Sequence, residues 1–157
     1  MGPGRATRGT GTTVPAMRIE RVVDAAAVGA AAELFDDPPL PEATADFLVR
    51  PGHHLLVAYD DAGHPVGLVS GVETTHPDKG TEMFLYELSV APDARRRGIG
   101  TELVRALAAL ATERACYGMW VGVDVDNDAA LATYRHAGAR EDGPFVTLSW
   151  NLTATDA

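Results

Sequence analysis

The residues best suited to chemistry lie in one short basic loop, Arg95–Gly100, which reads RRRGIG. An apolar strand pattern, Glu82–Val90, precedes this loop, and an apolar stripe at helical spacing begins at Leu103. Backbone N–H groups at a helix start have no partner within the helix and lie at the positive end of its dipole. Glycines let a ligand approach the backbone, and arginines add positive charge. The pattern therefore predicts a cradle for an anion such as pyrophosphate.

The loop alone does not identify its anion. It lacks the G-x-x-x-x-G-K-[ST] pattern of a P-loop and the third glycine of a dinucleotide fingerprint. A tight turn from strand to helix with solvated arginines would explain the same residues. Residues outside the loop must therefore distinguish an anion-binding site from a simple turn.

Glu87 is a carboxylate inside an otherwise apolar strand, where a charge is costly unless it is used or paired. Strict alternation places it on one face with Leu85 and Ser89, and places Tyr86 and Leu88 on the other. Further acids follow the next apolar strand or flank a proline loop; of these we expect Asp36, Asp37, Asp124 and Asp126, with Glu87, to bind a cation. Solvation alone would explain Asp36 and Asp37 singly. Helix capping with solvation explains Asn127 or Asp128, but it explains Asp124 less well.

Tyr134 is a candidate proton donor on the last helical segment. A phenol with a pKa of about 10 suits protonation of a leaving thiolate, whose thiol has a pKa of about 8.5. The alternative is a packed aromatic ring with its hydroxyl at the surface.

Composition limits the function classes. A length of 157 residues suits one domain, and the net charge of −9 argues against general nucleic-acid binding while suiting a cationic substrate or simple solubility. No apolar run is long enough to span a membrane, and the N-terminus has no signal-peptide core. The single cysteine fits a reducing, cytoplasmic compartment. The histidines lack metal-ligand spacing, so no metal is expected.

The elements that must position these residues follow from periodicity and turn signals. We expect a disordered leader over residues 1–16 and one domain over 17–157. The predicted strands are Met17–Val22, His53–Tyr59, Val66–Thr74, Glu82–Val90, Met119–Val125 and Phe145–Asn151. The predicted helices run from the Asp24 cap to Phe35, over Glu42–Val49, from the basic loop to about Glu113, and from Asn127 or Asp128 to His136. The order is β-α-α-β-β-β-α-β-α-β, an α/β mixed sheet.

The helix after the loop connects Glu82–Val90 to Met119–Val125, which makes these strands parallel neighbours. A ligand at the helix start would then lie at their C-terminal ends.

The assembled pattern resembles the GCN5-related N-acetyltransferase (GNAT) superfamily. LSVAPDARRRGIGTELV, from Leu88 to Val104, matches its acetyl-CoA signature [QR]-x-x-G-x-[GA]. NDAALATYRHAGARED, from Asn127 to Asp142, matches its N-x-x-A-x-x-x-Y-x-x-x-G pattern. Within the superfamily the chain looks closest to gentamicin-type aminoglycoside 3-N-acetyltransferases, through FLYELSV at Phe84–Val90 and the stretch Asp46–Gly67. Glu87 stands where those enzymes have a shorter acid, and Gly100 where they can have alanine.

The resemblance implies an acetyl-CoA-dependent N-acetyltransferase (EC 2.3.1) acting on a cationic small-molecule amine, most of all an aminoglycoside at its 3-N position, and hence antibiotic resistance. It implies a V-shaped splay between the strands Glu82–Val90 and Met119–Val125, where the pantetheine arm would bind. The cofactor-binding residues it implies are Leu88, Ser89, Val90, Arg95, Arg96, Arg97, Gly98, Ile99, Gly100, Thr101, Asn127 and Tyr134. The catalytic candidates are Tyr134 as acid, and Glu87 and Asp124 as base or substrate binder.

Two alternatives remain at this point. One is the same chemistry on another amine, such as a polyamine, an amino acid or a protein N-terminus. The other is a non-catalytic acyl-CoA-binding module. Relatives in the superfamily often pair as homodimers, which the resemblance leaves open for this chain.

Overall fold

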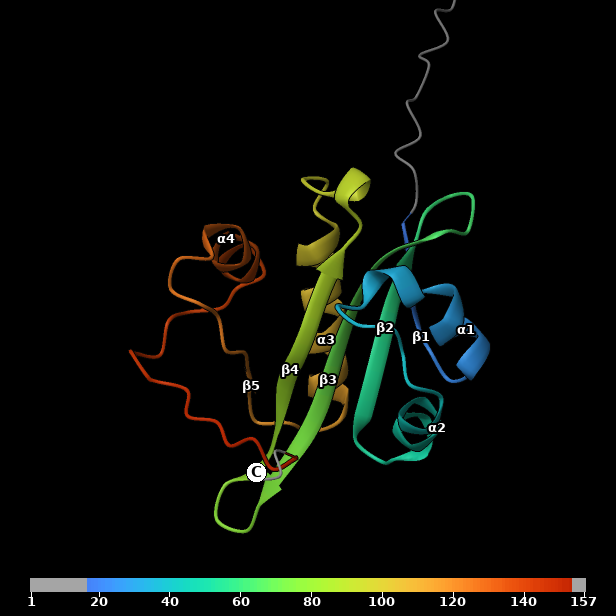
Figure 1. The fold of residues 1–157 in the computed structure, drawn as a ribbon. Helices are drawn as coiled ribbons and strands as arrows, with labels where there is room; N and C mark the ends of the chain where they lie inside the picture. The colour runs from blue at the N-terminus through green and yellow to red at the C-terminus, as the bar shows by residue number, and fades with distance from the viewer. Residues whose placement is uncertain (1–16, 154–157) are drawn as a thin grey trace, which may run out of the picture.

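The computed structural model describes residues 17–153, which form one five-stranded sheet with helices on both faces (Figure 1). The predicted leader, residues 1–16, lies outside the described residues. The strands are β1 (Arg18–Arg21), β2 (His53–Tyr59), β3 (Pro65–His76), β4 (Gly80–Val90) and β5 (Met119–Trp120). The helices are α1 (Ala25–Ala30), α2 (Pro41–Val49), α3 (Ile99–Glu113) and α4 (Asp128–His136), with 3₁₀ turns at Ala32–Leu34 and Pro92–Ala94.

The strands lie in the order β1-β2-β3-β4-β5. The first four are antiparallel neighbours, whereas β5 pairs parallel to β4 through the crossover of α3. The parallel pairing predicted from that crossover is therefore confirmed, as is the mixed α/β class.

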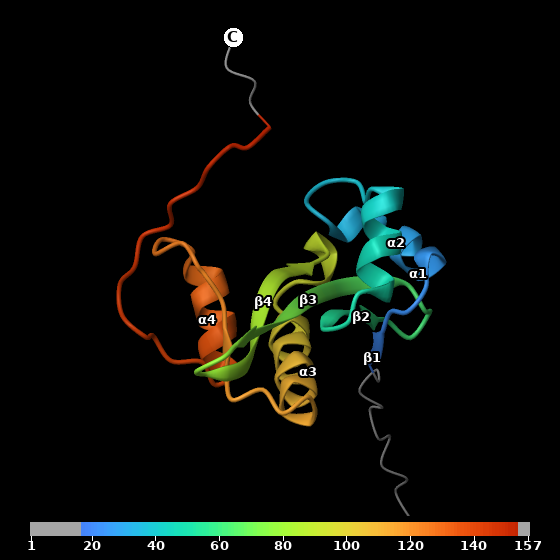
Figure 2. The same ribbon diagram turned by 90° about the horizontal axis from the view of Figure 1, so that it is seen from below.

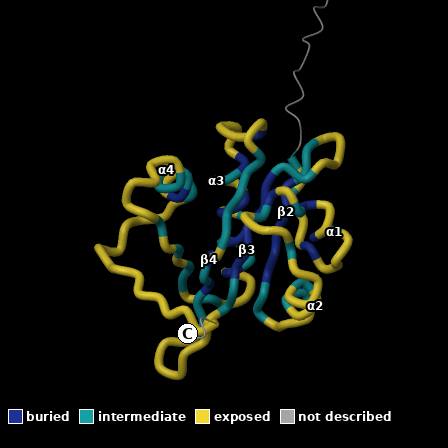
Figure 3. The backbone as a smooth tube through the Cα atoms, in the orientation of Figure 1, coloured by how far each residue is buried: buried dark blue, intermediate teal, exposed yellow. Residues whose placement is uncertain are grey.

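Side chains on the two faces of the strands belong to two separate hydrophobic cores. On one face Leu56, Val69 and Met83 pack beneath Leu103 and Leu107 of α3. On the other face a smaller core lies beneath α1, where Leu55, Val57 and Leu68 meet Val28 and Leu34. Figure 2 shows α3 on one face of the sheet and α1 and α2 on the other, and Figure 3 shows the buried strands between them.

The helix starts agree with the sequence signals because capping is local. The Asp24 carboxylate accepts a hydrogen bond from the Ala27 N–H at 2.9 Å, and the Asn127 side chain accepts one from the Ala130 N–H at 3.1 Å. The first helix is shorter than predicted, since α1 ends at Ala30 and a 3₁₀ turn carries Leu34 into the core.

One predicted strand is wrong in part, and another is wrong in full. Met119–Val125 is a strand only over Met119–Trp120, because β4 offers it just two paired positions, Met83 and Phe84. Phe145–Asn151 is not a strand in the described structure, and its side chains are exposed, Trp150 by 77%. An alternating apolar sequence becomes a strand only where an edge is available to pair with it. None of the described helices is long and apolar enough to cross a membrane.

A buried polar network fastens the end of α3 to the sheet. His54 of β2 is 1% exposed, and its Nε2 lies 2.8 Å from Oε1 of Glu73 on β3. The same carboxylate oxygen accepts a hydrogen bond at 2.7 Å from Arg114, which follows α3. Burial lowers the pKa of His54, against the opposing effect of Glu73. The Arg114 hydrogen bond is the main cause of a lowered pKa for Glu73.

The lowered pKa values of His54 and Glu73 predict that the folded protein is less stable in acid. The unfolded chain protonates His54 near its ordinary pKa of about 6.5, whereas the folded protein resists protonation, so this part of the stability is complete above that pH and is lost as the pH falls. Glu73 adds a loss of the same sign below about pH 4.5. Denaturant unfolding between pH 7.5 and pH 5 should show a decline that is weaker in His54→Gln and unchanged in His53→Gln. An equal decline in both variants would refute the role of His54.

Candidate active site

The site is organised by a bulge in β4. Ser70 of β3 pairs with Glu87 and the next residue, Gly71, pairs with Leu85, so Tyr86 is an extra residue without a partner on β3. Leu85 and Leu88 both pack on the α3 side, while Tyr86 and Glu87 line a cavity on the opposite face. The expectation that Glu87 shares a face with Leu85 is therefore wrong, because the bulge shifts the alternation by one residue.

The bulge also marks the point where β4 and β5 part. Their paired positions end at Phe84 and Trp120, whose rings stack with centroids 4.3 Å apart. Past Phe84 the β4 edge that faces away from β3 has no strand beside it among the described residues. This is the splay that the resemblance implied, although β5 is shorter than expected.

The open edge presents hydrogen-bonding groups. The Ala91 N–H bonds to Val66 on the β3 side, so by alternation the N–H groups of Val90 and Leu88 point away from β3. The Val90 carbonyl accepts a hydrogen bond from Nε of Arg95 at 3.1 Å, consistent with this direction. An extended amide-bearing arm could bind here as an added strand does.

The basic loop follows directly and has the geometry of an anion cradle. Buried Ala94 and Ile99 anchor its two ends, and the residues between them are exposed. Arg96 and Gly98 have positive φ values of 57° and 81°, so the chain turns sharply into α3. The first N–H groups of α3 have no acceptor within the helix, and none of the loop arginines forms an ion pair with a described residue. The residues therefore fit a pyrophosphate.

The two glycines of the loop have different structural roles. Gly98 starts α3 in the left-handed conformation, which favours glycine. A Cβ on Gly100 would lie 3.2 Å from Thr133 of α4 and 3.6 Å from Val90. Gly100 thus lets α4 approach the open edge of β4, in addition to any contact with a ligand.

The close packing of α4 against β4 positions Tyr134, which lies on α4. Tyr134 is 9% exposed and belongs to the core beneath α3, with Leu88 and Val90 at the margin of that core. No described residue hydrogen-bonds to its hydroxyl. Burial raises its pKa, which keeps the phenol protonated at neutral pH and free to donate.

Glu87 lies at one end of a cavity of about 340 Å³ between the sheet and the segment from α1 to α2. It is half-buried, and its Oε1 accepts a hydrogen bond from the Asp36 N–H at 3.3 Å. Burial is the main cause of a raised pKa for Glu87; the Asp36 charge also raises it, and the Asp36 hydrogen bond opposes. Most of the other walls are apolar, including Val28, Phe35, Leu40, Phe47, Leu55 and Val72.

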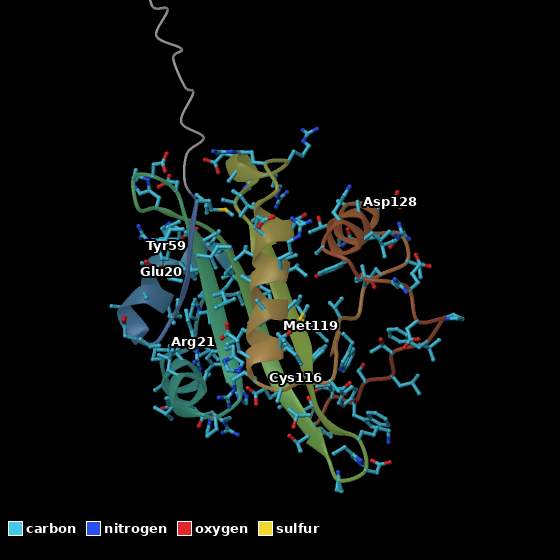
Figure 4. All side chains as sticks on the ribbon, turned by 180° about the vertical axis from the view of Figure 1, so that it is seen from behind. Glu20, Arg21, Tyr59, Cys116, Met119 and Asp128 are labelled. Atoms are coloured by element: carbon cyan, nitrogen blue, oxygen red, sulfur yellow. The ribbon has the colours of Figure 1, made fainter. Side chains whose placement is uncertain are left out.

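Only some of the acids that were predicted to bind a cation lie near Glu87 in the structure. Asp36 meets Glu87 through its backbone and lines a neighbouring cavity of about 230 Å³, but Asp37 lines neither cavity. Asp124 and Asp126 are exposed in the loop between β5 and α4 and line neither cavity. Asp128, at the start of α4, lies beyond the β4 and β5 end of the sheet, whereas α1 and α2 lie beside β1 and β2 at the other end (Figures 1 and 4).

Sequence reasoning missed the apolar walls and Ser70. Ser70 pairs with Glu87 across the strands, is 7% exposed and lines the same cavity. From the sequence, the aromatic residues Phe35, Phe47 and Tyr86 could be interpreted only as core or surface residues. Only the bulge and the fold of α2 over the sheet show that they border one cavity.

A sequence model of the acetyltransferase (GNAT) family matches residues 21–139. The chain belongs to this family. The implied cofactor is thereby confirmed, because GNAT acetyltransferases use acetyl-CoA.

The chain is similar to known acetyltransferases both in sequence and in structure. The chain is 35% identical over 114 residues to the N-alpha-acetyltransferase RimI of Mycobacterium tuberculosis, covering 71% of this chain and 69% of that protein. In structure it is similar to an aminoglycoside acetyltransferase from an uncultured soil metagenomic sample, with a TM-score of 0.79 at 22% identity, covering 87% of this chain and 97% of the other. An aminoglycoside N-acetyltransferase solved with CoA aligns with a TM-score of 0.73 at 18% identity, covering 88% and 97%.

The conformation of Gly98 yields a test. Gly98→Ala should destabilise the protein by about 1–2 kcal/mol, because an alanine at positive φ is strained, and should weaken CoA binding by distorting the start of α3. Gly29→Ala is the control, since an added Cβ there meets nothing within 4 Å and alanine favours a helix. Denaturant unfolding and calorimetric titration with CoA measure both effects. Unchanged CoA affinity in Gly98→Ala would contradict the cradle.

Proposed function

We propose that this GNAT N-acetyltransferase moves an acetyl group from acetyl-CoA to the primary amine of a small cationic acceptor. Bound acetyl-CoA supplies an activated acetyl thioester with a thiolate leaving group. The observation that carries the proposal is the arrangement around the open edge of β4, with a free phenol, Tyr134, on the α3 side and a half-buried carboxylate, Glu87, on the other.

Glu87 is the proposed base. An alkyl amine of pKa about 10 is only about 0.1% neutral at pH 7, so the reaction needs a group that binds the ammonium and takes one proton from it before the nitrogen attacks; the nitrogen loses a second proton as the amide forms. Burial makes Glu87 a stronger base than an exposed carboxylate. Asp124, also predicted as base, is exposed and lies outside the cavity, which favours Glu87.

Tyr134 is the proposed acid. Its hydroxyl would donate its proton to the departing sulfur, so that the thiolate leaves as a thiol. The N–H groups of Leu88 and Val90 would donate to the acetyl carbonyl oxygen, where negative charge develops during attack. Arg95, Arg96, Arg97 and the start of α3 would hold the pyrophosphate.

An aminoglycoside acceptor, predicted from the resemblance, remains a second candidate. The net charge of −9 favours a polycation, and the fold is shared with aminoglycoside acetyltransferases. Several of the similar structures are 6′-N-acetyltransferases, such as that of Acinetobacter baumannii, so the fold does not favour the predicted 3-N position. Thiol release with gentamicin, followed by mass spectrometry and NMR of the product, tests this acceptor and its position.

Tyr134→Phe should lower kcat by about 10²–10⁴-fold with little change in KM, because it removes only a proton donated in the transition state. Tyr117→Phe is the control, since Tyr117 is 58% exposed and bonds to Glu82. Steady-state thiol release measures both variants. An intact kcat in Tyr134→Phe would show that another group is the acid.

Glu87→Gln should lower kcat and remove the acidic limb of the pH–rate profile. That limb should lie above the ordinary carboxyl pKa of 4.5, because burial raises the pKa of Glu87 and activity is lost as the pH falls through it. Glu82→Gln on the same strand should keep the limb. A change in KM alone would make Glu87 a binding residue and not the base.

A further inference from the structure

The cavity beside Glu87 shows what the acceptor amine should carry. Its one carboxylate lies at the β4 bulge, where Glu87 is opposite Ser70 on the neighbouring strand, while Thr44 of α2 and His53 of β2 add polar side chains elsewhere in the lining. No described residue hydrogen-bonds to the Ser70 hydroxyl, so this hydroxyl and the Glu87 carboxylate remain available to a ligand. They suit one ammonium group, which needs a counter-charge and hydrogen-bond acceptors.

The rest of the cavity offers little to a polar ligand. Leu55 and Val28 are buried in its wall, Val72, Phe35 and Phe47 are half-buried, and Leu40 is exposed at its margin. The rings of Phe47 and His53 meet edge to face at 5.4 Å. Glu87 is the only carboxylate among the described lining residues, which include no lysine or arginine.

This distribution of charge decides between acceptor classes. A polycation held inside this cavity would place its additional ammonium groups against apolar walls, where they lose hydration without gaining a carboxylate; the acids of the neighbouring cavity, Glu33 and Asp36, do not line this one. A free amino acid would place its carboxylate beside Glu87 with no lysine or arginine in the lining to balance it. A monoamine with a bulky apolar group and no adjacent carboxylate meets neither cost and buries apolar surface.

From this chemistry we propose that the cavity selects a primary amine next to a large apolar side chain, with the neighbouring carbonyl in amide form, as at the N-terminus of a polypeptide that begins with an apolar residue. This inference rests on the proposed acetyl transfer and specifies its acceptor. The ammonium binds at Glu87 and Ser70, and the apolar side chain fills the space between α2 and the sheet.

The experiment compares kcat/KM for thiol release from acetyl-CoA with phenylalanine amide, leucine amide, glycine amide, free phenylalanine, gentamicin and spermidine. Phenylalanine amide and leucine amide should exceed glycine amide by at least about 10-fold, because a single methylene group in an apolar pocket already changes kcat/KM by about 10–200-fold. They should also exceed free phenylalanine and both polycations.

A pair of variants on α2 tests the cavity itself. Ala43 lines the cavity and Ala45 does not, and both are exposed on the same helix, so each should tolerate a carboxylate. Ala43→Asp should lower kcat/KM for phenylalanine amide about 10-fold and raise it for gentamicin. Ala45→Asp should leave the ratio between the two acceptors unchanged.

The possible failures are distinct. No thiol release with any amine would overturn the acetyl transfer and this inference with it. Turnover in which glycine amide equals phenylalanine amide, or in which gentamicin or spermidine is the best acceptor, would overturn the apolar acceptor and leave the acetyl transfer standing. An equal effect of Ala43→Asp and Ala45→Asp would show that this cavity is not where the acceptor binds.

Discussion

One extra residue in β4 determines the shape of the site. Tyr86 has no partner on β3, so every side chain after it changes face relative to strict alternation. The pairing with β5 ends at Phe84, just before this bulge, and the far half of β4 keeps an unpaired edge. The bulge thus opens backbone groups at Leu88 and Val90 and turns Glu87 towards the cavity at the same time. Without it, Glu87 would enter the core beneath α3.

What could be predicted from the sequence is what depends on local signals. The caps at Asp24 and Asn127 and the sharp turn at Gly98 follow from neighbouring residues alone, and the structure contains all three. The parallel pairing of β4 with β5 follows from the long apolar helix between them. Two sequence motifs in the right order then sufficed to identify the acetyltransferase family, which the family match confirms.

What could not be predicted depends on which segments meet. Alternation in Phe145–Asn151 is as regular as in a true strand, yet β5 is too short to offer it an edge. Asp124 and Asp126 were expected to bind a cation together with Glu87, but the chain leaves the sheet after Trp120, and both acids are exposed and do not line the cavity of Glu87. A bulge has no reliable sequence signature, so the orientation of Glu87 could not be read from its position in the strand.

The same apolar walls set both the basicity of Glu87 and the range of acceptors. A carboxylate that lies among apolar side chains holds a proton more readily, which suits it to take one from an ammonium group. Those walls cannot also solvate several further charges. A site with many acids would bind a polycation well, but each added carboxylate would have to be paired or solvated in its turn. The single half-buried carboxylate therefore ties the proposed chemistry to an acceptor with one charge at the reacting nitrogen and an apolar body behind it.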